Sequence, residues 1–182
     1  MPTKRLPSLD RYTLGILALL AANPTRSYYQ REIARKAKVS VGKTNQVLNR
    51  LRELDMVTRE PRGKIHLYRY NLDDPAARHL KIFLNLTELS GLSRALRKVS
   101  NKVVLFGSVA DGSDTEESDI DLLIVTADKR GTEEALAQGG KEAGRNIAPV
   151  VLSQLEFSGL KKEDPAFYEQ AARGIVLWQK GE

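Results

Sequence analysis

The feature that most constrains the fold is a pair of short apolar segments joined by a loop rich in glycine and aspartate. Residues 103–106 and 120–125 are predicted strands, because each is a short apolar run bounded by polar residues. The first run ends at Gly107-Ser108, and the second is preceded by Asp119 and contains Asp121. Residues two apart on a strand point to the same face, so we expect both carboxylates on one side of a sheet.

These residue types suit phosphate and metal chemistry. Backbone N–H groups and the hydroxyl at Gly107-Ser108 are suited to hold the phosphates of a nucleotide where the first strand ends. Paired carboxylates bind hard divalent cations, which stabilise the attacking and leaving oxygens of a phosphoryl displacement. A bound cation also relieves the repulsion between Asp119 and Asp121. The motif therefore predicts nucleotide binding at Gly107 and Ser108 and metal binding with catalysis at the two aspartates.

The motif resembles that of the DNA polymerase β-type nucleotidyltransferase superfamily, and in particular its minimal nucleotidyltransferase branch. That branch has Gly-Ser, a spacer of about ten residues, and Asp-hydrophobic-Asp; here the spacer is Val109–Ser118. The resemblance covers roughly residues 100–180 and implies a small mixed sheet flanked by helices. It also implies a nucleoside triphosphate bound at Gly107 and Ser108, with Mg2+ or Mn2+ at Asp119 and Asp121.

One position departs from this family's pattern. Active members carry a third carboxylate on a later strand, and the matching strand here, within residues 146–153, contains neither Asp nor Glu. The matching position is Ala148, and the nearest oxygen-bearing alternatives are Asn146 and Glu156. Two hypotheses therefore stay open: a transferase that moves a nucleotidyl group onto a protein or nucleic-acid hydroxyl, and a degenerate domain that senses nucleotide or binds a partner.

Charge is divided unevenly along the chain. The net charge is +6, yet residues 1–100 hold 20 Lys and Arg against 8 Asp and Glu, whereas residues 101–182 hold 9 against 15. This pattern favours a basic half that faces a polyanion and an acidic half that faces cations. Chance sorting of surface charge is the alternative.

The basic half has the pattern of a winged helix-turn-helix. An apolar helical face ends at Asn23-Pro24, and Ser27–Gln30 has the form of a capping box that begins a second helix. A turn at residues 38–40 precedes a third helix, in which Thr44, Val47, Leu48 and Leu51 recur at helical spacing. Alternating residues around Pro61-Arg62-Gly63 predict a β-hairpin. This half resembles the winged-helix module fused to such transferase domains in some prokaryotic regulators.

The third helix and the hairpin supply the predicted DNA contacts. If the apolar positions of the helix face the core, its polar positions face the major groove, where Asn, Gln, Arg and Lys read base edges or hold phosphates. The predicted DNA-binding residues are Gly42, Lys43, Asn45, Gln46, Asn49 and Arg50 on the helix, and Arg59, Arg62, Lys64 and His66 on the wing. A protein–protein module with a solvated basic face is the alternative.

The sequence thus predicts an α+β protein of two domains. Residues 1–72 form the winged helix-turn-helix domain, 73–100 a connecting helix, and 101–182 a nucleotidyltransferase-fold mixed sheet flanked by helices. Within the last domain, further strands are predicted at 147–152 and 175–178, and helices at 133–143 and 165–172.

Composition excludes several other classes of protein. The chain has no Cys and two His, which excludes a disulfide scaffold, a thiol nucleophile and a Cys- or His-rich metal site. Its apolar runs are too short to span a bilayer and no secretion signal is recognised, so we expect a cytoplasmic protein without a membrane partner. The expected partners are double-stranded DNA and a nucleotide. A homodimer formed through the first or connecting helix, and an antitoxin-like role beside a separate toxin, are further hypotheses.

Overall fold

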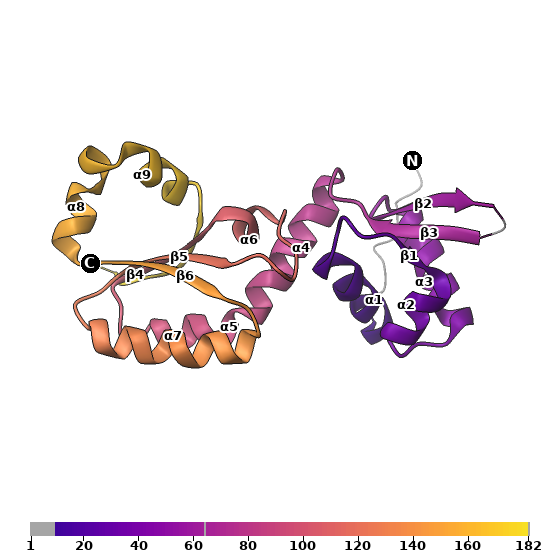
Figure 1. Ribbon diagram of the computed structural model, residues 1–182, viewed down its shortest axis with the longest axis horizontal. Coiled ribbons are helices and arrows are strands. Elements are labelled where there is room, and N and C mark those ends of the chain that lie inside the picture. The colour runs from indigo at the N-terminus through magenta and orange to yellow at the C-terminus, as the bar shows by residue number, and fades with distance from the viewer. Residues whose placement is uncertain (1–9, 64, 182) are drawn as a thin grey trace. The chain divides into compact units, whose positions relative to one another are not determined.

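The computed structural model describes residues 10–63 and 65–181. The chain divides into two compact units, residues 1–81 and 82–182, which are described separately (Figure 1). Among the described residues no helix is both long enough and apolar enough to cross a membrane.

The first unit is a three-helix domain with a three-stranded antiparallel sheet of order β1-β3-β2. Its elements are α1 (Arg11–Ala22), β1 (Tyr28–Tyr29), α2 (Gln30–Lys36), α3 (Val41–Glu53), β2 (Val57–Arg62) and β3 (Ile65–Tyr70). The hairpin register pairs Val57 with Tyr70 at its base and Arg62 with Ile65 at its tip. Three helices and a hairpin make the predicted winged helix-turn-helix.

Local signals fix the ends of the helices in this unit. Asp10 caps α1 by accepting the Thr13 N–H at 2.8 Å, and this hydrogen bond lowers the pKa of Asp10 to about 2. Ser40 caps α3 by accepting the Lys43 N–H at 3.3 Å. The core contains fully buried side chains from all three helices, among them Leu17, Ile33 and Leu48. The four positions of α3 predicted to face the core are all buried.

The predicted capping box at Ser27–Gln30 is wrong. Tyr28 and Tyr29 form β1, which pairs with Tyr68 and Leu67 of β3, and the N-cap of α2 is Tyr29, without a side-chain hydrogen bond. The Tyr28 side chain is 2% exposed. Burial of this ring and the ladder to β3 place the segment in a strand, so the local capping signal does not decide its structure.

The second unit is a four-stranded mixed sheet covered by helices on both faces. Its strand order is β6-β5-β4-β7; β5 and β6 are parallel, and β4 is antiparallel to β5 and β7. The elements are α4 (Pro75–Glu88, which begins in the first unit), α5 (Ser90–Leu96), β4 (Lys102–Phe106), α6 (Gly107–Asp111), β5 (Ile120–Val125), α7 (Lys129–Ala143), β6 (Ile147–Leu152), α8 (Gln154–Glu163), α9 (Pro165–Ala172) and β7 (Ile175–Gln179).

Alternation along β4 and β5 separates the two sides of this sheet. Val103 and Leu105, with Leu122 of β5, belong to the cluster that packs against α5 and α7. Val104 and Phe106 pack on the opposite side, with Phe167 and Ala171 of α9. Figure 1 shows α5 and α7 below the sheet and α8 and α9 above it.

The sequence predicted every strand of this sheet but missed two helices, α6, where a loop was expected, and α8. α8 was not predicted, although Ser153 and Glu156 form a capping box at its start. The segment predicted as one connecting helix, residues 73–100, forms α4 and α5, which meet at Leu89. β6, which contains Pro149, lies at the edge of the sheet as the proline suggests.

Candidate functional site

Gly107 forms the turn between β4 and α6 and lies against Asp121. Its φ is +69°, a conformation that L side chains rarely adopt, and a Cβ at this position would collide with the Asp121 carboxylate. The antiparallel register places Asp121 opposite Phe106, the residue before Gly107. The glycine is therefore required both for the turn and for the close approach of the carboxylate.

The two aspartates differ in environment. Asp119 is exposed and its Oδ1 accepts a hydrogen bond from Asn146 Nδ2 at 3.0 Å. Asp121 is half-buried, and this burial, followed by the charge of Asp119, raises the pKa of the Asp121 carboxyl above its ordinary value. Burial beside a like charge disfavours the ionised form, and a cation favours it, so this pair is suited to bind a divalent metal ion.

The structure places Ala148 beside the pair. The parallel register of β5 and β6 sets Ala148 opposite Asp121. Within residues 10–63 and 65–181, no group of three or more His, Cys, Asp and Glu side chains is close enough to hold a metal ion. Glu156 follows the opposite end of β6, where its carboxylate accepts the Ser153 N–H at 2.6 Å. Glu156 therefore does not supply a third carboxylate at this site.

A buried ion pair supports the loop that leads to Asp119. Asp114, 2% exposed, receives hydrogen bonds from Arg145 Nη1 at 3.1 Å and Asn85 Nδ2 at 2.8 Å. The same arginine donates to the Ser118 carbonyl oxygen from Nε at 3.1 Å and Nη2 at 2.8 Å. Asp114 is thus buried and paired, although it lies in an acidic loop. Arg145 lies in a loop, and nothing in the sequence around it predicts its pairing with Asp114.

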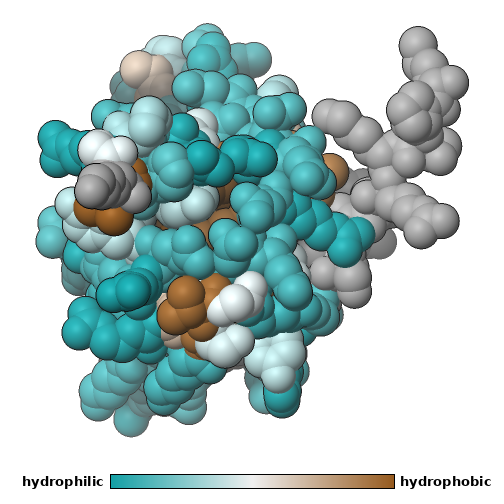
Figure 2. Space-filling view, turned by 90° about the vertical axis from the view of Figure 1, so that its right-hand side faces the viewer, coloured by the Kyte–Doolittle hydropathy of each residue, from teal (hydrophilic) through white to brown (hydrophobic). Residues whose placement is uncertain are grey.

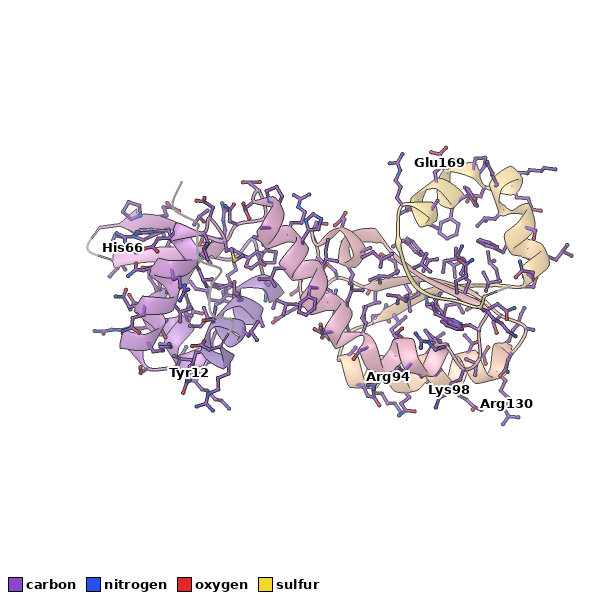
Figure 3. The ribbon with its side chains drawn as sticks, turned by 180° about the vertical axis from the view of Figure 1, so that it is seen from behind. Tyr12, His66, Arg94, Lys98, Arg130 and Glu169 are labelled. Atoms are coloured by element: carbon purple, nitrogen blue, oxygen red, sulfur yellow. The ribbon has the colours of Figure 1, made fainter. Side chains whose placement is uncertain are left out.

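A pocket of about 580 Å3 lies next to Gly107. It is lined by residues of α6, of α9 and of the segment that follows α9, including Asp111, Glu169 and Arg173. Figure 3 labels Glu169 on α9, on the side of the sheet opposite the labelled residues of α5 and α7. Sequence reasoning named none of the α9 residues that line this pocket, because nothing in the motif indicates that this helix returns to it.

The polar positions of α3 lie where the sequence placed them. Gly42, Asn45, Gln46 and Arg50 are exposed, and Lys43 and Asn49 are half-buried. The Lys43 ammonium forms an ion pair with Asp10 Oδ2 at 3.2 Å and lies 5.6 Å from the centre of the Tyr12 ring. Lys43 is thus held beside the start of α1 by a partly exposed ion pair.

The wing contains three described residues of the predicted set. Arg59 and Arg62 are exposed, and His66 is half-buried. Arg59 Nη2 donates to His66 Nε2 at 2.9 Å across the hairpin (His66 is labelled in Figure 3). Lys64 lies outside the described residues.

Two exposed apolar residues of this unit were missed. Val41, at the start of α3, is 49% exposed, and Ile65, at the start of β3 beside the hairpin turn, is 52% exposed. The face drawn in Figure 2 is largely hydrophilic, with a few separate hydrophobic spots. Apolar side chains at such positions can contact thymine methyl groups or base steps.

We expect metal-free Asp121→Asn to unfold at a higher temperature than the wild type at neutral pH. A carboxyl pKa above its ordinary value of 3.8 means that folding disfavours the ionised form, so this group destabilises the folded state as pH rises through the raised pKa. Thermal melts in a chelator, at neutral pH and near pH ~4, measure the effect, which shrinks at the lower pH as wild-type Asp121 becomes protonated. A variant that melts below the wild type at neutral pH contradicts this interpretation.

Comparisons with known proteins match both halves of the chain. Residues 94–182 match the family described as polymerase beta, nucleotidyltransferase, and residues 9–58 match the one described as winged helix-turn-helix DNA-binding. One similar solved structure is that of TrmBL2, an archaeal chromatin protein described as showing a novel mode of DNA binding, at 15% identity over 88% of this chain and 71% of that chain. Its TM-score is 0.30, which does not establish a common fold. No curated protein sequence matches. The family matches confirm the predicted resemblance: this chain carries a winged helix-turn-helix DNA-binding domain followed by a nucleotidyltransferase domain of the polymerase beta family.

Proposed function

We propose that this protein is a DNA-binding regulator of transcription whose nucleotidyltransferase domain binds a nucleoside triphosphate together with Mg2+ or Mn2+. One observation carries the nucleotide part of the proposal. Asp121 is held against Gly107, beside Asp119 and next to a pocket of about 580 Å3. Because the same chain carries a winged helix-turn-helix, nucleotide binding in this pocket would act on DNA binding.

The residues present fit a single hard cation. Mg2+ is commonly bound by one or two carboxylates, with substrate phosphates and water completing its shell. Asp119 and Asp121 would hold the ion, which when bound offsets the charge of the phosphates. Gly107 allows the phosphates to approach the backbone closely, and Ser108, half-buried at the start of α6, offers its hydroxyl as a donor.

The absence of a carboxylate at Ala148 favours binding over transfer. Transfer would form a bond between an acceptor oxygen and the α-phosphorus and release pyrophosphate, and the acceptor hydroxyl must lose its proton. Ala148, opposite Asp121, offers no base for that proton. We therefore propose that nucleotide occupancy changes the affinity of the protein for its operator.

Nucleotidyl transfer is the second candidate function, and the intact Gly107-Ser108 and Asp119-Ile120-Asp121 elements favour it. Incubation with an α-labelled triphosphate, Mg2+ and the full chain distinguishes the two functions. Labelled protein or nucleic acid that is absent with Asp119→Asn shows transfer. Nucleotide-dependent operator affinity without any labelled product shows sensing.

DNA binding has a predicted salt dependence. Each phosphate contact contributes roughly 0.9 to the slope of log affinity against log salt, so a domain using α3 and the wing has a steep slope. We expect Arg62→Ala to weaken binding on every sequence and to reduce the slope by about 1. Fluorescence anisotropy of the full chain on a labelled duplex, from about 50 to 200 mM salt, measures both.

Arg130→Ala is the matched control for this titration. Arg130 is an exposed arginine of the other unit and pairs with Glu134 at 3.1 Å. We expect its removal to leave the slope unchanged. A wild-type slope near zero would instead favour the protein–protein interpretation of the first unit.

A further inference from the structure

We infer that Arg173 binds the phosphates of the nucleotide in the pocket between α6 and α9. The inference rests on the proposed binding of a triphosphate by this domain and names a residue outside its sequence motif. Four observations support it: the face of the sheet that Asp121 occupies, the close approach of α9 to β4, the lining of the pocket, and its charge.

Asp121 lies on the side of the sheet that α9 covers. Leu123 packs with Val104, Phe106 and Ala171 on that side. Asp121 precedes Leu123 by two residues on the same strand, and residues two apart share a face. Asp121 therefore faces the same layer as α9, away from α5 and α7.

Gly174 holds the end of α9 close to β4. A Cβ at Gly174 would collide with the Leu105 carbonyl oxygen, and the Gly174 N–H donates to the Ala171 carbonyl oxygen at 3.0 Å. The next residue, Ile175, pairs with Leu105 in the antiparallel ladder. If the same antiparallel register is extended by two residues beyond the Ile175–Leu105 pair, Arg173 lies opposite Gly107. Arg173 is thus anchored at the end of β4 where the nucleotide motif begins.

Gly107 and Arg173 line the same pocket. Its volume of about 580 Å3 lies within the range of small-ligand sites, roughly 300–1,000 Å3. The pocket is also lined by Glu169 and Gln170, which precede Gly174 by about one helical turn. A nucleotide with its phosphates at Gly107 would therefore have Arg173 beside it.

Charge balance identifies the ligand group that Arg173 fits. Of the described residues that line the pocket, Arg173 alone is positively charged, whereas Asp111 and Glu169 are acidic. A triphosphate has more negative charge than one divalent cation offsets, and the cation itself occupies the two aspartates. A planar guanidinium can donate two parallel hydrogen bonds to phosphate oxygens. Arg173 is exposed, so its side chain can contact a phosphate without any rearrangement of the fold.

Calorimetric titration of the full chain with ATP and Mg2+, and separately with adenosine, tests the assignment. We expect Arg173→Ala to weaken ATP binding by about tenfold to hundredfold, the range for a hydrogen bond to a charged group, and to leave adenosine binding unchanged. Arg173→Lys keeps the charge but loses the planar pair of donors, and we expect it to fall between the wild type and the alanine variant. Arg130→Ala, on the other side of the sheet, is the control and binds ATP as the wild type does.

The outcomes separate this inference from the proposed function. If the wild type binds ATP with Mg2+ and Arg173→Ala binds it as tightly as Arg130→Ala, the inference is overturned and the proposed function remains. An equal loss of ATP and adenosine binding in Arg173→Ala also overturns it, because the residue would then support the pocket rather than bind phosphate. A wild type that binds neither ATP nor GTP with Mg2+ overturns the proposed function, and the inference with it.

Discussion

Replacing Asp121 with asparagine is expected to cause a large loss of Mg2+-dependent nucleotide binding. Only Asp119 and Asp121 are assigned to the cation, and removal of an indirect supporting group at a metal site already costs ten- to hundredfold. We expect the loss to exceed ~100-fold, because asparagine removes a ligand charge directly. Calorimetry with ATP in the presence and absence of Mg2+ measures it.

The structure offers a matched control for this substitution. Glu117→Gln removes the same charge from an exposed position in the loop before Asp119. We expect Glu117→Gln to bind ATP and Mg2+ as the wild type does, and both variants to bind DNA normally at low nucleotide. If Asp121→Asn and Glu117→Gln bind nucleotide equally well, the aspartate pair does not hold the cation.

The largest effect on stability is expected at Arg145. Its removal leaves the Asp114 carboxylate, 2% exposed, without its arginine and also deletes two hydrogen bonds to the Ser118 carbonyl oxygen. Breaking one side of a buried ion pair costs about 3–5 kcal/mol, since the buried carboxylate loses its cationic partner. We expect Arg145→Ala to lower the free energy of unfolding of the second unit by this amount.

Trp178 provides the signal for that measurement. It is the single Trp of the chain, and its Nε1 donates to the Ser100 carbonyl oxygen within the second unit. Urea unfolding of the full chain, followed by its fluorescence, compares Arg145→Ala with Arg130→Ala, whose exposed pair contributes within about 1 kcal/mol. Equal midpoints for the two variants would show that the buried pair does not stabilise the loop.

Two segments of this chain have the sequence pattern of a capping box, but only one of them forms it. Ser153 and Glu156 form a capping box at the start of α8, whereas Ser27 and Gln30, with the same spacing, do not. At the second site Tyr28 is buried and pairs with β3, so tertiary pairing overrides the cap. α8 itself was missed because its apolar positions face different ways: Leu155 is 83% exposed and Leu160 is buried. Capping chemistry identifies an end of a helix only where no strand competes for the same backbone.

Some features of the candidate site can be predicted from local sequence, whereas others depend on contacts between distant segments. That Asp119 and Asp121 share a face is a prediction from the two-residue period of a strand, which needs only local sequence. The contact of Asp121 with Gly107 and its register opposite Ala148 depend on pairing between strands. Asp114 and Arg145 are 31 residues apart, and nothing local to either residue indicates their pairing. Arg173 lines the same pocket as Gly107, and Gly174 beside it lets the end of α9 approach β4.

The central claim is that the second unit binds a nucleotide through a divalent cation. Its most direct test is calorimetric titration of the full chain with ATP and with GTP, each in the presence and absence of Mg2+, with mass spectrometry of the mixtures afterwards. The account predicts saturable binding of at least one nucleotide that requires Mg2+, with the mass of the protein unchanged. Failure of both nucleotides to bind in the presence of Mg2+ would contradict it.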